Sequence, residues 1–267
     1  MEKLKAVIVG GCSYCAGDEL AGELLVPGYT DRKWRPGFED RELYEVLRLQ
    51  MRPSHKKFRK YLQTCLERSW VGHLDKIITT PVKNISRGGA SNQEISYRLM
   101  KDAVGRWKKS KTLRGYLYIC SLSSPARLAI MNSDDKHNIS TINISRSIND
   151  MSWYVPGAEK FVEKMYFAHD DDDFLWYSVA GILALREYIT MHGGYFMIVD
   201  TGLWHRFVNE LEDKRFAKQL ESLLNANLNF FAVASTFRNL SGGHVEEAAH
   251  KKFANVVKKA MEKKYNV

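Results

Sequence analysis

Two cysteines and a serine lie within four residues near the amino terminus, in the stretch GGCSYCAGDEL from Gly10 to Leu20. The stretch follows the short apolar run AVIV almost directly. The spacing of Cys12 and Cys15 is that of a thiol redox pair or of half a zinc site. Ser13 between them carries a hydroxyl that could act as a nucleophile. A third interpretation is a tight turn after a strand, without chemistry.

The surrounding sequence favours the serine over the cysteines. The chain has four cysteines and no second C-x-x-C that would complete a zinc site. Small residues lie near Ser13 on both sides (Gly10, Gly11, Ala16 and Gly17), so a substrate carbonyl could come close and meet backbone N–H groups. A serine nucleophile needs a base, and His244 lies in a Gly-Gly-His turn before the last helical segment. The alternative for His244 is an ordinary loop or capping histidine.

Apolar runs and helical patterns alternate along the 267 residues. We expect buried strands within 5–10, 80–86, 115–123, 193–202 and 229–235, and helices within 40–51, 55–77, 93–107, 157–192, 205–225 and 244–264. Strands that alternate with helices predict a parallel sheet covered on both faces. The predicted fold is therefore a three-layer α/β/α sandwich with about five parallel strands, in one domain over 1–267. Residues 21–69 are interpreted as an insertion, and the region from 124 to 154 as irregular and polar.

Four loops with small polar residues follow predicted strands: GGCSYCAGD, RGGASN, SLSSPAR and NLSGGH. Ligands of parallel sheets bind at the carboxyl ends of the strands. We therefore expect these loops to converge and to form the site. Asp200 and His205, just beyond the predicted strand within 193–202, either line the same cleft or stabilise the edge of the core.

These motifs together resemble the SGNH (GDSL-type) hydrolase family, most closely its phage- and virus-encoded members. The first block of the family matches GCSYCAG at 11–17, the second matches NISRGGASN at 84–92, and the last matches the turn that contains His244. The sequence SSPAR at 123–127 resembles a further motif of the phage-like members. The resemblance covers nearly the whole chain in the right order.

The resemblance implies an esterase, an O-acyl hydrolase or an acyl transferase that uses neither cofactor nor metal. Its substrate would be a small or polymer-linked ester. Ser13 would be the nucleophile and His244 the base. The oxyanion hole would combine the N–H groups of Ser13 and Gly89 with the side-chain amide of Asn92. Ser123 and Arg127 would contact the substrate.

The sequence departs from the family pattern at three places. Cys12 replaces an aspartate before the nucleophile, and SLSS stands where the family has an asparagine of the oxyanion hole. Ser241 stands where the family has the aspartate that orients the histidine. The site is then a Ser–His dyad supported by Ser241, a triad that uses Asp18 or Asp200, or the inactive site of a binding protein.

Charge and composition bear on partners and location. The net charge is +9, with basic stretches at 52–60, 106–111 and 250–264. These are interpreted as solvated helix faces, and the alternative is a nucleic-acid-associated phage protein. HDDDD at 169–173 is interpreted as a surface turn or helix start rather than a metal site. No apolar stretch is long enough to span a bilayer, and the few cysteines favour a reducing cytoplasm.

Overall fold

A computed structural model gives the structure of the protein. It describes residues 3–17, 20–24, 56–124, 127–131, 139–143, 171–201, 228–237 and 245–265, together with Trp204, Val208, Lys218, Glu221 and Leu224. Two of the residues predicted for the site, His244 and Ser241, lie outside these ranges, as do Asp18 and His205.

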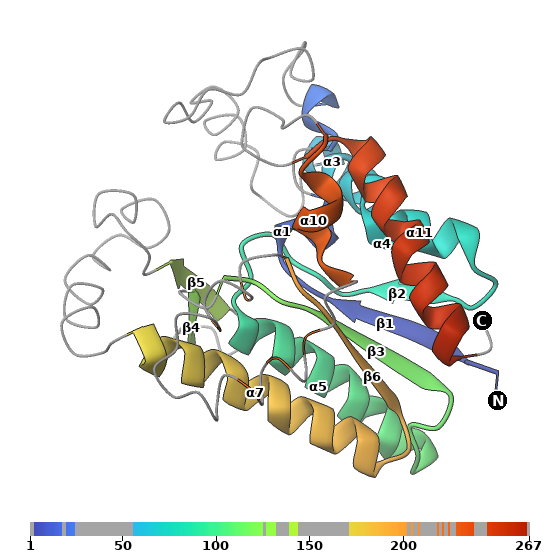
Figure 1. Ribbon diagram of the computed structural model, residues 1–267, viewed down its shortest axis with the longest axis vertical. Helices are drawn as coiled ribbons and strands as arrows, with labels where there is room; N and C mark the ends of the chain where they lie inside the picture. Colours follow the sequence, from blue (N-terminus) through green and yellow to red (C-terminus); the bar gives the residue numbers. More distant parts are fainter. Residues whose placement is uncertain are drawn as a thin grey trace.

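A parallel sheet of four strands forms the centre of the described fold (Figure 1). The strands are β1 (Ala6–Gly10), β2 (Val82–Asn84), β3 (Tyr116–Ser121) and β6 (Tyr195–Val199), in the order β2-β1-β3-β6. Beyond β6, Asn229 forms a single parallel bridge with Asp200. The α/β class and the parallel sheet are confirmed, with four strands described where about five were expected.

Helices cover both faces of this sheet (Figure 1). On one face lie α5 (Asn92–Ser110) and α7 (Asp171–Met191). On the other lie α4 (Trp70–Ile77), α10 (Phe230–Ala234) and α11 (Glu247–Lys264). The remaining helical elements are α1 (Ser13–Ala16), η1 (Gly22–Leu24) and α3 (Lys56–Arg68). The arrangement is compatible with a three-layer α/β/α fold.

The alternation of side chains along the strands builds two separate cores. Ile8, Tyr118 and Ile198 face α5 and α7 and pack against apolar side chains such as Leu99 and Leu185. The strand residues between them belong to the second core, with α4, α10 and α11: Val7, Val9, Leu117, Ile119, Met197 and Val199. Because both faces are buried, β1, β3 and β6 have mainly apolar sequences, which explains why these strands could be predicted.

The structure differs from the predicted elements at three places. The stretch 229–235 was predicted as a strand, which is wrong, because Phe230–Ala234 forms α10. The region expected to be irregular contains two antiparallel strands, β4 (Arg127–Met131) and β5 (Ile139–Asn143). The single helix expected over 55–77 is divided at Ser69, whose Oγ caps α4 by accepting from Gly72 N at 3.1 Å.

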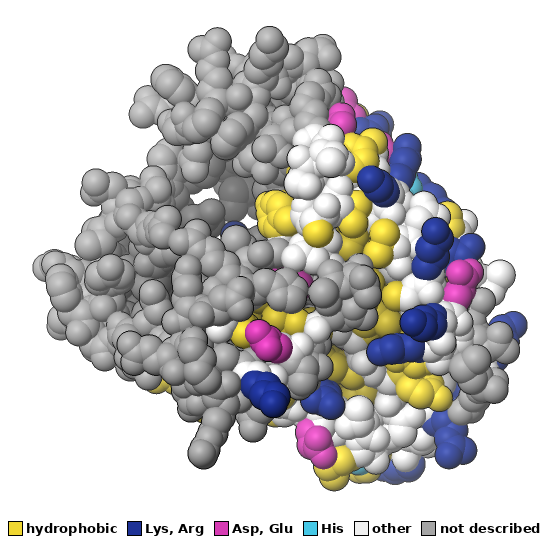
Figure 2. All heavy atoms as spheres, viewed as in Figure 1, with side chains coloured by type: hydrophobic (Ala, Val, Ile, Leu, Met, Phe, Trp, Pro, Cys, Tyr) yellow, Lys and Arg dark blue, Asp and Glu magenta, His cyan; other side chains and the backbone are white. Residues whose placement is uncertain are grey.

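Two predictions about the surface can be compared with the described residues. Of the acidic run at 169–173, residues 171–173 form the first turn of α7, as expected for a helix start. Lys and Arg side chains are spread over the α11 side of the face in Figure 2, with Asp and Glu among them, as solvated helix faces would be. No helix in the described part of the chain has the length and apolar character that a membrane crossing requires.

Candidate active site

Ser13 begins a one-turn helix just beyond the carboxyl end of β1. Cys12 is extended (φ −91°, ψ −156°), and its carbonyl accepts from the N–H groups of Cys15 and Ala16, both at 3.0 Å. Within the described part of the chain, the N–H of Ser13 has no backbone acceptor, as is usual at a helix start. The turn thus places the Ser13 hydroxyl and the Ser13 N–H at the edge of the sheet.

The end of this turn requires a glycine. Gly17 has φ +73°, and its N–H donates to Ser13 O at 2.7 Å. A Cβ at this position would lie 2.2 Å from Cys65 O of α3. Both the left-handed backbone and the close approach exclude a side chain. The short helix that carries Ser13 is therefore held directly against α3.

The loop between β2 and α5 lies beside the Ser13 turn. Arg87 N donates to Gly11 O at 3.1 Å, and the side chain of Asn84 donates to Cys15 O at 2.9 Å. Gly89 has φ +74° in the turn closed by Ala90 N and Arg87 O, and a Cβ there would have no atom within 4 Å. The first two predicted loops therefore meet, and Gly89 faces open space.

A buried carboxylate fixes this second loop. Glu94, on the first turn of α5, is 1% exposed at its side chain and accepts from Arg87 Nη2 at 2.6 Å and Arg98 Nε at 2.9 Å. Its backbone N–H donates to Ser91 Oγ at 3.2 Å, which caps the helix. Glu94 was not predicted as a site residue from the sequence. The S-x-x-E spacing from Ser91 is the signal that could have indicated it.

Asn92 and Ser123 join the second loop to the third. Asn92 Oδ1 accepts from Ser123 N at 2.7 Å, and its Nδ2 donates to Ser123 O at 3.0 Å. Ser123 O also accepts from Trp204 Nε1 at 2.7 Å, and Arg127 Nη1 donates to Ser123 Oγ at 3.0 Å. The predicted pair Ser123 and Arg127 is therefore in contact. The Asn92 amide, expected in the oxyanion hole, instead bonds the backbone of the neighbouring loop.

Asp200 lies where β6 ends, and it is 1% exposed. Its Oδ1 accepts from Trp204 N at 3.4 Å, while its backbone bonds Leu228 and Phe230 at 3.0 and 2.8 Å. These contacts stabilise the edge of the core, which is one of the two roles that the sequence left open for this residue. Val245, which directly follows His244, is buried in the same core as Cys15 of α1.

The two cysteines beside Ser13 are buried free thiols. Burial, and to a smaller extent the neighbouring Cys12, raises the pKa of Cys15 far above its usual range. A buried, protonated thiol is a poor nucleophile and a poor metal ligand. Among the described residues no three His, Cys, Asp or Glu side chains gather as a metal site would need. The burial of both thiols and the raised pKa of Cys15 do not support the redox and zinc interpretations.

A buried histidine on the last helix was not predicted from the sequence. His250 on α11 is 1% exposed, and its Nδ1 accepts from Trp70 N at 3.1 Å. Its ring centroid lies 5.0 Å from that of Phe230. Since Nδ1 is an acceptor, the proton of the neutral ring is on Nε2. The contact joins α11 to the start of α4, which is a structural role.

No protein-family model matches the chain, and no match was found among curated proteins.

Proposed function

We propose that this protein is a serine hydrolase of the SGNH type that cleaves, or transfers, an ester-linked acyl group. One observation carries the proposal: Ser13 begins a one-turn helix directly beyond the carboxyl end of β1, a central strand, with the β2–α5 loop hydrogen-bonded beside it. Nucleophilic residues of open α/β sheets lie at such strand-to-helix turns, at the edge where ligands bind.

The proposed reaction has two stages. Ser13 Oγ attacks the acyl carbon while His244 accepts the hydroxyl proton, and the proton then passes to the leaving alcohol as its bond to carbon breaks. Water or another alcohol attacks the acyl-enzyme, and the serine is regenerated. Support for His244 as the base is that Val245, the next residue, packs in the same core as Cys15.

Backbone N–H groups would stabilise the negative oxygen of each intermediate. Ser13 N–H has no backbone acceptor in the described part of the chain, and Gly89 borders open space in the adjoining loop. A single donor of this kind contributes about 10²–10³-fold in rate. Because the Asn92 amide already bonds the N–H and the carbonyl of Ser123, we propose a hole of the two N–H groups, with Asn92 as a residue that positions the loops.

Ser123 and Arg127 would contact the substrate from the third loop. The hydrogen bond from Arg127 Nη1 to Ser123 Oγ, 3.0 Å long, holds the guanidinium near the carboxyl end of β3.

The His244 imidazole would use one nitrogen as the base, and its other nitrogen has three candidate partners, Ser241, Asp18 and Asp200. Replacing each by alanine should identify the partner by its loss of rate, since the orienting group also stabilises the imidazolium.

The test is hydrolysis of p-nitrophenyl acetate by the wild-type protein and by Ser13→Ala. We expect the variant to lose about 10³-fold or more in kcat/KM, because the nucleophile is removed. Ser235→Ala is the matched control, since this exposed hydroxyl directly follows α10 and donates to Ala232 O. Equal rates for wild type and Ser13→Ala would refute the proposed nucleophile.

A further inference from the structure

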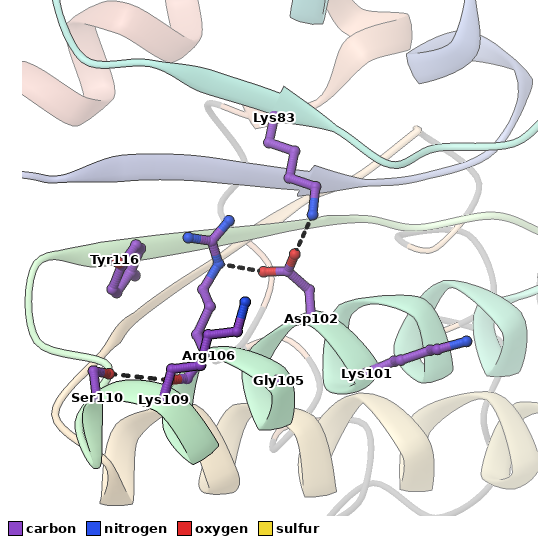
Figure 3. A pocket seen from close by; sticks show the side chains of 8 residues that line it. All are labelled: Lys83, Lys101, Asp102, Gly105, Arg106, Lys109, Ser110 and Tyr116. Carbon is purple, nitrogen blue, oxygen red and sulfur yellow. Dashed lines mark hydrogen bonds and ion pairs between the residues drawn. The ribbon is translucent and has the colours of Figure 1, made fainter.

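A basic pocket lies on the edge-strand side of the sheet, between β2, α5 and the start of β3 (Figure 3). Its volume is about 410 Å³. Since Tyr116 begins β3 and α5 runs back along the sheet, the pocket extends toward the amino ends of the strands, away from Ser13. The residues that line it are Lys83, Lys101, Asp102, Gly105, Arg106, Lys109, Ser110 and Tyr116.

One carboxylate organises the cations of this pocket. Asp102 is 9% exposed at its side chain and pairs with both Lys83 of β2 and Arg106 of α5. The hydroxyl of Tyr118 also donates to Asp102, at 3.3 Å. Burial raises the pKa of Asp102, but the hydrogen bonds from Arg106 and Lys83 outweigh burial and hold it below the usual value. Asp102 is thus charged and fixes two cations from different elements.

The pocket keeps an excess of positive charge. Four of its lining side chains are cationic and one is anionic. Among the described residues, neither Lys101 nor Lys109 has an acidic partner. A surface that served only to close the edge of the sheet would need no such excess. The charge therefore favours an anionic ligand.

Arg106 is arranged as a phosphate-binding arginine would be. Its Nε donates to Asp102, and its guanidinium carbon lies 4.7 Å from the centroid of the Tyr116 ring. In Figure 3 its two terminal nitrogens point away from Asp102. A planar guanidinium that is already oriented can bind two phosphate oxygens at once.

Gly105 leaves the floor of the pocket open. It lies in the interior of the 19-residue α5, where glycine is among the least favourable residues. Its φ is not positive, and a Cβ there would have no atom within 4 Å. Neither backbone conformation nor packing requires a glycine, whereas any side chain would extend into the space between Lys101 and Lys109, four residues to either side.

We propose that this pocket binds a ligand that carries two phosphate groups. Lys101 and Lys109 are eight residues apart on α5, which is about 12 Å along the helix axis, so the site is long enough for more than one phosphate. Two sources supply this chemistry, a free diphosphate compound and the backbone of a nucleic acid. The site is independent of Ser13, and its failure would leave the proposed hydrolase unaffected.

The experiment measures binding of pyrophosphate by calorimetry and of a single-stranded DNA 12-mer by fluorescence anisotropy, both at 50 mM salt. We expect Lys101→Gln/Lys109→Gln to weaken binding about tenfold, since two charged contacts are lost. Lys108→Gln/Lys263→Gln removes the same charge from exposed helix positions outside the pocket, and it should change binding less than about twofold.

The variant Gly105→Gln tests the effect of filling the pocket without changing its charge. It leaves every cation in place and replaces glycine by a better helix former, so the protein should unfold at an unchanged or higher temperature. We expect it nevertheless to weaken binding about tenfold, by filling the pocket.

Binding of pyrophosphate would identify a free diphosphate compound as the source, and binding of the 12-mer alone would identify nucleic acid. Three results would overturn the proposal: no binding of either probe, equal loss in the pocket and control double variants, or full binding by Gly105→Gln.

Discussion

Replacing Asn92 tests whether this residue positions the loops or takes a direct part in the reaction. Its side chain is fully buried and bonds both the N–H and the carbonyl of Ser123, which joins the loops after β2 and β3. Replacing Asn92 by alanine removes both bonds. If these bonds are its function, the variant should lose stability, and any loss of activity should follow from loosened loops.

The size of the effect follows from which atoms lose their partner. Ser123 O keeps the hydrogen bond from Trp204 Nε1 at 2.7 Å. The N–H of Ser123 loses its acceptor in the described structure, in a residue that is 1% exposed. An unsatisfied buried donor costs about 1–3 kcal/mol. For a domain of this size that corresponds to a fall in Tm of roughly 2–10 °C.

Urea unfolding and calorimetry of Asn92→Ala measure this cost. Asn255→Ala is the matched control, because the Asn255 amide donates to Lys251 O on the exposed side of α11, and its loss should change the free energy of unfolding by less than about 0.5 kcal/mol. Unchanged stability of Asn92→Ala together with a loss of kcat would refute the positioning role and restore Asn92 as an oxyanion donor.

Two further predictions concern the Ser13 turn. Gly17→Ala should destabilise the protein by about 2 kcal/mol or more in urea unfolding, because φ is +73° and the new Cβ would approach Cys65 O; a change below about 0.5 kcal/mol would contradict the turn geometry. Cys15 should resist iodoacetamide at pH 8 in the native protein and react in urea, because it is buried and its pKa is raised; rapid native labelling at Cys15 would show an accessible thiol.

The sequence was most informative where both sides of an element are buried. The strands β1, β3 and β6 are continuous apolar runs because each alternates between two cores. The sequence of Phe230–Ala234 is equally apolar, yet it forms a helix. Asn229 Oδ1 caps it by accepting from Ala232 N at 3.0 Å, and Phe230 packs into the core beside Phe253. Local composition could not separate this short buried helix from a strand.

Four loops were predicted to converge because the carboxyl ends of parallel strands share one edge. Three of them meet in the described structure, and the fourth, NLSGGH at 239–244, lies outside the described residues. The contacts within that edge were not predicted. Asn92 and Ser123 are 31 residues apart, and Lys83 and Asp102 are 19 apart. No periodicity or spacing rule encodes such a pairing, because it depends on where separate elements cross in space. The hydrogen bonds of Asn92 and the basic pocket could therefore be recognised only in the structure.

Covalent labelling of Ser13 tests the central claim most directly. A fluorophosphonate reacts with an activated serine, and the tryptic peptide 6–32 contains Ser13 as its single serine. We predict one adduct on this peptide by mass spectrometry, absent in Ser13→Ala and formed far more slowly in His244→Ala. A folded wild-type protein that remains unlabelled, or an adduct on another peptide that persists in Ser13→Ala, would contradict the account.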